Sequence, residues 1–248
     1  QTLVYADGSF EITLTDVTQA EKNRLLKQQM SHNITHELRT PVSSISGYLE
    51  TLLSCPNLSE EQQTRFLQKA HAQTLRLTDL IRDVALISKT EEAPELMPVE
   101  EIDIRQVVDE AAEEFSNPLE EAGIRFCSEL PELTIRGNYT LVHAIFRNLL
   151  ENAVRYAGHG VEVHVVCYSV TSEFAYFSFY DTGCGVEESH LPRLFERFYR
   201  VDRGRTRADG GTGLGLSIVR NAVAFHRGTI SVRNRKEGGL EFLFSLHV

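Results

Sequence analysis

The sequence contains little that would support a metal cluster or a disulfide framework. It has four cysteines, and no two of them form a Cys-x-x-Cys pair or lie at zinc-finger spacing from a histidine. A structural zinc site is therefore not expected, and the composition suits a reducing compartment. The four thiols are interpreted as buried or incidental side chains: Cys55, Cys127, Cys167 and Cys184.

Long apolar runs and an excess of positive charge are also missing. No apolar stretch approaches the ~20 residues that span a bilayer. The first residue is Gln rather than Met, so we expect a fragment, with any membrane segments lying upstream. The net charge of −10 argues against nucleic-acid binding, which needs basic patches. What is present, 42% hydrophobic and 24% charged residues, is enough for a globular core.

The first third of the sequence has the periodicity of two long helices. Alternating apolar residues at 8–17 predict a strand, which is too short to be stable alone. From about 20 to 53, apolar residues recur at helical spacing, and Ser59 with Gln62 then forms a capping box for a second helix to about 88. Two antiparallel helices cannot enclose their shared apolar face, so we expect a homodimer that completes a four-helix bundle.

After a charged, proline-marked linker the pattern changes to alternating helices and strands. Helices are predicted at 103–121, 139–157 and 213–226, and strands at 123–130, 161–170, 174–180, 228–233 and 239–247. This alternation indicates an α/β or α+β domain of roughly 150 residues. The basic, glycine-rich stretch 200–213 is expected to form a long mobile loop.

The segment "MSHNITHELRTPV" places His36 two residues from apolar positions on either side. Two residues turn a helix by about 200°, so His36 should point away from the apolar face. A zinc-protease pattern fails because Thr40 stands where the second histidine is needed, and pairing His32 with His36 leaves metal binding a minor possibility. Glu37 can polarise the imidazole of His36 and make it a better nucleophile, and Pro41 predicts a bend nearby.

The segment "RNLLENAVRY" places two amides one helical turn apart. The side-chain oxygens of Asn148 and Asn152 could hold Mg²⁺, and Arg155 could reach a phosphate. Two surface asparagines on an amphipathic helix are the ordinary alternative.

Two glycine-rich stretches follow. "DTGCG" puts Asp181 at a strand end, followed by glycines that let a ligand approach the backbone. "GGTGLGLSIV" opens a helix whose free N–H groups suit a phosphate. A Walker A loop is excluded because no Gly-Lys-Ser/Thr exists, and a dinucleotide fingerprint lacks its preceding strand. An ATP-binding loop of another kind remains.

Together these stretches strongly resemble the cytoplasmic core of the sensor histidine kinases of bacterial two-component systems. "SHNITHELRTP" is similar to the phosphoacceptor motif, and "NLLENAVRY", "DTGCGV", "FERFYRVD" and "GGTGLGLSIV" are similar, in order, to the four boxes of the ATP-binding domain. The resemblance implies a multidomain chain. An all-α hairpin forms a four-helix bundle on dimerisation, and an α/β two-layer sandwich of the gyrase and histidine kinase superfamily follows.

The resemblance also implies a division of the chain. Residues 1–19 would be the tail of an upstream sensor domain of PAS type or a linker, and 20–92 the dimerisation and histidine phosphotransfer domain. Residues 93–98 would be a linker and 99–248 the catalytic ATP-binding domain. The chain would be the cytoplasmic portion of an inner-membrane sensor protein.

Residue roles follow from the same resemblance. His36 would be autophosphorylated, Glu37 would assist as base or hydrogen-bond partner, and Thr40 would position water during dephosphorylation of the partner. Asn152 would hold Mg²⁺ with Asn148 nearby. The other residues implied at the ATP site are Arg155, Tyr156, Asp181, Gly183, Gly185, Phe195, Phe198, Gly211, Thr212, Gly213, Leu214 and Gly215.

The implied activity is that of an ATP:protein-histidine phosphotransferase. A homodimer would phosphorylate His36 from Mg·ATP and pass the phosphoryl group to an aspartate of a separate response regulator. Phosphatase activity toward that regulator is expected as well. Two alternatives stay open: a superfamily ATPase without phosphotransfer, as in gyrase and MutL, and a dimer that only binds a regulator or mainly dephosphorylates it.

Overall fold

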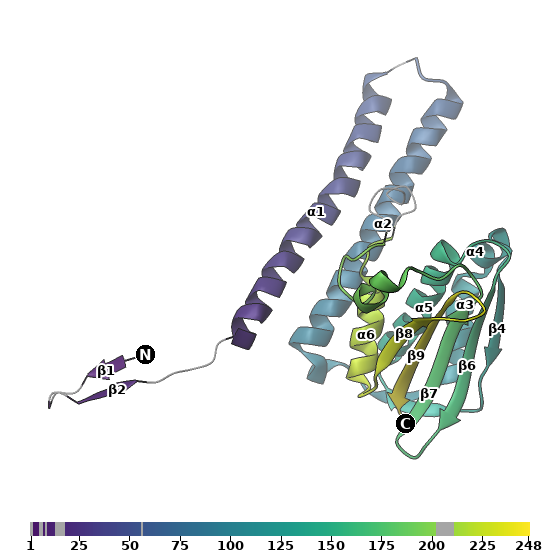
Figure 1. Cartoon of the computed structure of the whole chain (residues 1–248). Coiled ribbons are helices and arrows are strands. Elements are labelled where there is room, and N and C mark those ends of the chain that lie inside the picture. The colour runs from purple at the N-terminus through teal and green to yellow at the C-terminus, as the bar shows by residue number, and fades with distance from the viewer. Residues whose placement is uncertain (1, 5–6, 8, 13–17, 56, 202–210) are drawn as a thin grey trace.

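A two-helix hairpin stands beside an α/β unit in the computed structural model of the chain (Figure 1). The structure describes residues 2–4, 7, 9–12, 18–55, 57–201 and 211–248, with the backbone alone at 2–4, 10–12 and 18–27. At the N-terminus, β1 (Thr2–Val4) pairs antiparallel with β2 (Phe10–Ile12). The strand predicted at 8–17 is therefore three residues long where it is described, and 13–17 lie outside the described residues.

The hairpin consists of α1 (Thr18–Ser54) and α2 (Glu60–Glu92). The capping box predicted at the start of α2 is confirmed: Gln62 N donates to Ser59 Oγ at 3.2 Å, and Ser59 N donates to the Gln62 side chain at 3.0 Å. The helix α1 continues through Pro41, and α2 extends past its predicted end at residue 88.

The α/β unit is built on one five-stranded sheet. The strand order is β4 (Arg125–Glu129), β6 (Glu162–Val170), β7 (Phe174–Asp181), β9 (Leu240–His247) and β8 (Ile230–Asn234). The pair β4–β6 is parallel and the other pairs are antiparallel. The helices of this unit are α3 (Ile104–Glu114), α4 (Ser116–Glu121), α5 (Tyr139–Tyr156) and α6 (Gly215–Phe225).

Helices and sheet share one hydrophobic core, which makes the unit a two-layer sandwich (Figure 1). Its centre is Phe146 of α5, which is fully buried and meets the rings of Phe177 and Phe244 edge-on at 6.3 and 6.0 Å between centroids. Every second residue of β7 and β9 points inward along much of each strand, as expected when one face of a sheet is covered. The predicted fold, a helical hairpin followed by an α/β sandwich, is confirmed.

Some details differ from the sequence-based expectation. The helix predicted at 103–121 breaks at Phe115, because Pro118 has no N–H to donate to the carbonyl of Glu114. An additional antiparallel pair, β3 (Glu100–Asp103) with β5 (Thr134–Gly137), was not predicted, since each strand has only four residues. Short 3₁₀ helices occupy Pro94–Leu96 and Glu188–Arg193. Within the described part of the chain, no helix is both long and apolar enough to cross a bilayer.

The hairpin and the sandwich are packed against each other through a small second core, which we call the junction. It consists of Leu80 and Ile87 from α2 together with Ala144, Leu214 and Ile218 from the sandwich. Met30 and Leu38 of α1 pack at its edge. The junction places the start of α6 directly against the hairpin that carries His36.

Candidate functional site

A cavity of about 320 Å³ opens between α5 and the residues that precede α6. It brings together nine of the residues implied at the ATP site: Asn148, Asn152, Arg155, Tyr156, Gly185, Gly211, Thr212, Gly213 and Gly215. These residues come from stretches more than fifty positions apart in the sequence, and the fold gathers them between α5 and the start of α6. We call this space the nucleotide cavity.

The helix α5 presents its polar residues to the cavity at spacings of four. The helix starts at Asn138, whose side chain accepts a hydrogen bond from Leu141 N at 3.0 Å. Asn148 is buried and donates from Nδ2 to the carbonyl of Ala144 at 2.7 Å, which fixes its amide. No hydrogen bond engages the amide of Asn152 in the described part of the chain, and this residue lines the cavity, so its amide is open to a ligand.

We call residues 211–215 the glycine loop. Its glycines allow the backbone to pack closely against Asn148 and Phe198. A Cβ on Gly215 would lie 2.6 Å from Asn148 Oδ1, and a Cβ on Gly213 would lie 2.9 Å from the Cα of Phe198. Gly213 also has a φ of 71°, which favours glycine. The loop is held by Phe198 N, which donates to Gly213 O at 2.7 Å. Gly211, Gly213 and Gly215 line the cavity, so the backbone at the start of α6 lies against it, where N–H groups suit a phosphate.

Asp181 lies behind the cavity wall rather than on it. It is 5% exposed, and its two carboxylate oxygens accept from Gly183 N at 2.8 Å and Leu240 N at 3.4 Å. Burial raises the pKa of Asp181 above its usual range, and these two backbone donors act in the opposite direction. Position 183 must be glycine in this conformation, because a Cβ there would clash with the carbonyl oxygen of Ala157. Asp181 and Gly183 thus hold the backbone beside Leu240 and Gly185, and these two neighbours line the cavity.

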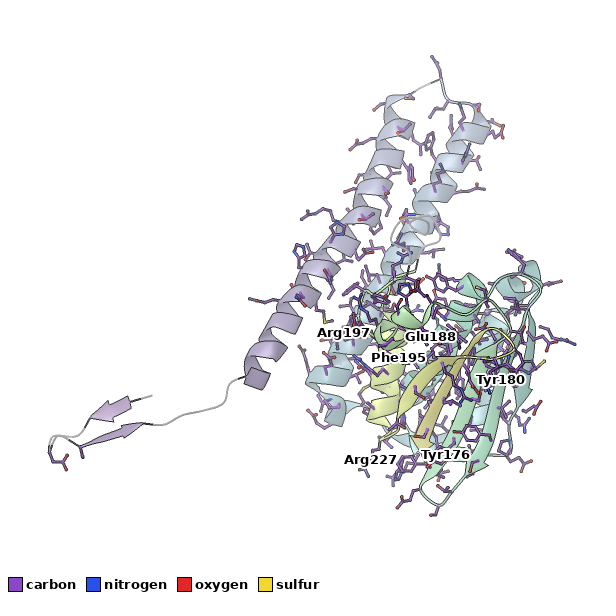
Figure 2. All side chains as sticks on the ribbon, viewed as in Figure 1. Tyr176, Tyr180, Glu188, Phe195, Arg197 and Arg227 are labelled. Atoms are coloured by element: carbon purple, nitrogen blue, oxygen red, sulfur yellow. The ribbon has the colours of Figure 1, made fainter. Side chains whose placement is uncertain are left out.

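Three more residues implied at the ATP site, Phe195, Phe198 and Leu214, do not line the cavity. Phe195 packs edge-on against Phe242 in the sandwich, with ring centroids 6.3 Å apart. Phe198, with a φ of 61°, and Leu214 pack in the junction against the hairpin. Figure 2 shows Arg197 between Phe195 and the hairpin, where it contacts Met30 Sδ at 3.0 Å and the carboxylate of Glu91. This segment thus couples the cavity to the hairpin.

The sequence assigned no role to nine residues of the cavity wall, although it placed one of them, Cys184, inside the turn of DTGCG. They are Glu151, Cys184, Val186, Leu194, Tyr199, Arg200, Val201, Leu216 and Leu240. Seven of them lie inside the quoted motifs but were given no role there, Leu194 directly precedes one motif, and Leu240 lies outside all of them. Of the four cysteines, Cys55 and Cys184 are exposed and the other two are partly buried, so the first two would be incidental rather than buried thiols.

His36 lies on the open face of α1, and its side chain is 61% exposed, as the helical spacing predicts. Its Nδ1 is 3.9 Å from Glu37 Oε1, which is near contact but longer than a hydrogen bond. Thr40 donates from Oγ1 to the carbonyl of His36 at 3.2 Å, and Pro41 is buried one residue further on. An exposed imidazole beside a carboxylate is chemically available to an incoming electrophile.

A magnesium ion at this site would need oxygen ligands from the protein. No group of three or more His, Cys, Asp or Glu residues among the described side chains could hold a metal ion. Mg²⁺ needs few protein ligands when phosphates and water complete its octahedron. The open amide of Asn152 therefore fits a magnesium ion that arrives with a nucleotide.

Comparison with known proteins adds independent findings. Residues 137–248 match the family of histidine kinase-, DNA gyrase B- and HSP90-like ATPases, and residues 26–93 match the His Kinase A phosphoacceptor domain. The phosphate regulon sensor protein PhoR of Pseudomonas aeruginosa is 32% identical over 245 residues, 96% of this chain and 54% of PhoR. The sensor-like histidine kinase SenX3 of Mycolicibacterium smegmatis is 30% identical over 97% of this chain and 62% of its own length.

A solved structure shows the same fold. Histidine kinase ThkA, solved in complex with the response regulator protein TrrA, superposes with a TM-score of 0.68 at 20% identity, over 100% of this chain and 73% of ThkA. The chain spans about half to two thirds of the length of the two curated relatives named above. Both of its matched regions occur in the order that this family has, hairpin first and ATPase second. The chain therefore belongs to the sensor histidine kinases, with a phosphoacceptor domain and an ATPase domain.

Proposed function

We propose that the chain phosphorylates its own His36 from Mg·ATP bound in the nucleotide cavity. One observation carries this proposal: the exposed imidazole of His36 lies on the same hairpin against which the cavity-bearing sandwich is packed. A superfamily ATPase without phosphotransfer would have no need for this histidine or for the junction.

The chemistry is nucleophilic attack on a phosphoryl group. Neutral imidazole forms a P–N bond to the γ-phosphorus through Nε2 while the bond to the bridging oxygen breaks, and ADP leaves with that electron pair. Glu37 lies on the Nδ1 side, where it orients the ring and receives the proton that the imidazole loses. The protein contributes mainly positioning and neutralisation of charge, as is general for phosphoryl transfer.

Different cavity residues would bind the metal ion, the phosphates and the adenine of the nucleotide. Asn152 would hold Mg²⁺, which supplies charge neutralisation at the phosphates, and Asn148 lies against the neighbouring start of α6. The glycine loop would receive the phosphates on its N–H groups. Asp181 would accept from the adenine amino group, next to the turn at Gly183 and Gly185.

We propose that the phosphoryl group then moves to an aspartate of a response regulator. ThkA was solved with such a regulator, and this chain shares its fold. Thr40 lies one turn from His36. It would position a water molecule that hydrolyses the phosphoryl group on the regulator. Thr40→Ala should then keep autophosphorylation and slow loss of phosphate from the regulator; equal slowing of both would remove this role.

The acting unit would be a homodimer, as part of a larger membrane sensor. Its support is a set of exposed apolar side chains along both helices: Val42, Leu49, Leu53, Leu67, Leu75 and Ile81. A second hairpin packed along these helices would remove such side chains from water. Light scattering should give twice the chain mass of 28.0 kDa; a single-chain mass at micromolar concentration would contradict the dimer.

The direct test compares two histidines on one helix. His36→Gln should abolish label transfer from [γ-³²P]ATP and retain nucleotide binding, while the matched control His32→Gln, one turn earlier and also exposed, should label like the parent. The label should be acid-labile and alkali-stable. Undiminished labelling of His36→Gln would sink the proposal.

A further inference from the structure

A second cavity of about 310 Å³ lies between α2 and α5, beside the nucleotide cavity. Three residues, Glu151, Arg155 and Thr212, line both cavities, so the two spaces adjoin. The second cavity therefore leads from the nucleotide toward the hairpin. Its wall on the hairpin side includes Arg76 of α2.

Arg76 reaches from this cavity to the helix that carries His36. Its side chain is 15% exposed, and its Nη2 donates to Glu37 Oε2 at 3.4 Å across the two helices. The other oxygen of the same carboxylate, Glu37 Oε1, is the atom that faces His36 Nδ1. The two oxygens of Glu37 are thus divided between a fixed cation and the imidazole.

This division has a physical consequence for Glu37. A glutamate has three rotatable side-chain bonds, and without a partner its carboxylate would sample orientations that do not face His36. A mostly buried guanidinium keeps its charge at all relevant pH values and holds one carboxylate oxygen by a charge-assisted bond. The second oxygen is then directed toward His36.

The other arginines of the second cavity have different partners. Arg147 contacts Asp79, Glu114 and Glu151 at 3.5 to 3.7 Å, and so ties α2, α3 and α5 together. Arg155 is bound to Glu151 at 2.7 Å. In the described part of the chain, Arg76 is the arginine of this cavity that contacts the phosphoacceptor helix.

We propose that Arg76 is a positioning residue for phosphoryl transfer, holding Glu37 against His36 at the point where the second cavity reaches the hairpin. This inference rests on the function proposed above. It assigns a part in the reaction to a residue of α2, outside every motif that the sequence displays.

The test measures autophosphorylation rates over a range of Mg·ATP concentrations with the whole chain. Arg76→Ala should lower kcat by about 10- to 100-fold, the cost of a misplaced catalytic group, with KM changed less than about threefold. Arg76→Lys should recover part of the rate, because it restores the charge without the planar fork. The matched control is Arg65→Ala, an exposed arginine three turns earlier on nearly the same face of α2, which should match the parent.

A double-mutant cycle separates positioning from mere structural support. In a Glu37→Gln background, Arg76→Ala should cost less than about threefold, because the residue through which it acts is already impaired. Circular dichroism and binding of a non-hydrolysable ATP analogue should be the same in every variant.

The outcomes are distinct. Absence of label on the parent protein would overturn the proposed function, and this inference with it. Normal labelling of the parent with an unchanged rate in Arg76→Ala would overturn only the role of Arg76. A rise in KM alone, or full additivity with Glu37→Gln, would also overturn it, since Arg76 would then bind nucleotide or act independently of Glu37.

Discussion

Thr212 of the glycine loop donates a hydrogen bond from Oγ1 to Asp83 Oδ2 on α2, at 3.0 Å. Thr212 lines the nucleotide cavity, and Asp83 is 7% exposed between the hairpin and the sandwich. One bond therefore joins the loop expected to hold phosphates to the helical hairpin. Whatever moves the hairpin away from the sandwich must break this bond and expose Asp83.

The protonation state of Asp83 should control how firmly the two units dock. Burial raises its pKa from 3.8 to about 6, and the Thr212 hydroxyl partly offsets that effect. Undocking would return Asp83 to water and to its ordinary pKa, so the docked state binds the proton more tightly. Asp83 thus favours docking fully below pH 3.8, and this contribution is lost as the pH rises through about 6. The charged groups facing Asp83 are Glu151, Arg147 and Asp79.

The size of this effect can be measured. The ratio of docked to undocked protein should fall by about tenfold between pH 5 and pH 8. Spin labels on Cys55 and Cys184, with the other two cysteines replaced by serine, would report the ratio as a distance distribution, because both thiols are exposed.

Two variants isolate the contribution of Asp83. Asp83→Asn keeps an acceptor for Thr212 but cannot ionise, so its docked fraction should not change over this pH range. Glu61→Gln, an exposed acid in the first turn of the same helix, should behave like the parent. A full pH response in Asp83→Asn would show that another group titrates.

Cys184 offers an independent probe of the nucleotide cavity. It is exposed and lines the cavity, whereas Cys55, also exposed, lies at the far end of α1. Mg·ATP at ten times its Kd should slow maleimide modification of Cys184 by about tenfold, by simple competition for the free site. Peptide mass spectrometry reads both thiols in one sample, and Cys55 should be unaffected. Equal modification of Cys184 with and without nucleotide would place ATP elsewhere.

Gly183 and Gly47 form a contrasting pair of glycines. A Cβ at Gly183 would clash with the carbonyl of Ala157 and displace Asp181, whereas a Cβ at Gly47 of α1 meets nothing within 4 Å. Gly183→Ala should lower the free energy of unfolding of the sandwich by about 1–3 kcal/mol and weaken nucleotide binding. Gly47→Ala should raise the stability of the hairpin by about 0.5–1 kcal/mol. Urea titration measures both, and a neutral Gly183→Ala would refute the close packing of this turn.

Sequence patterns within single stretches predicted much of the architecture. The capping box at Ser59 and the amphipathic pattern that became α5 lie within single stretches of sequence, so each could be recognised without its neighbours. The pairing of β3 with β5 could not, because four-residue strands carry too little pattern to identify.

The candidate site was predictable in part for the same reason. Glycines and asparagines in short motifs marked the nucleotide cavity. The contacts of Asp83 with Thr212 and of Glu37 with Arg76 join residues 129 and 39 positions apart, on different elements. Nothing in either stretch alone indicates its partner, because those pairs depend on how the helices pack.

The most direct measurement is the location of the phosphoryl group after incubation with Mg·ATP. Mass spectrometry under neutral to alkaline conditions, which preserve phosphohistidine, should find about 80 Da added to the peptide that contains His36, and nothing on that peptide in His36→Gln. A phosphoryl group on another residue, or ATP turnover without any phosphorylated peptide, would contradict the account.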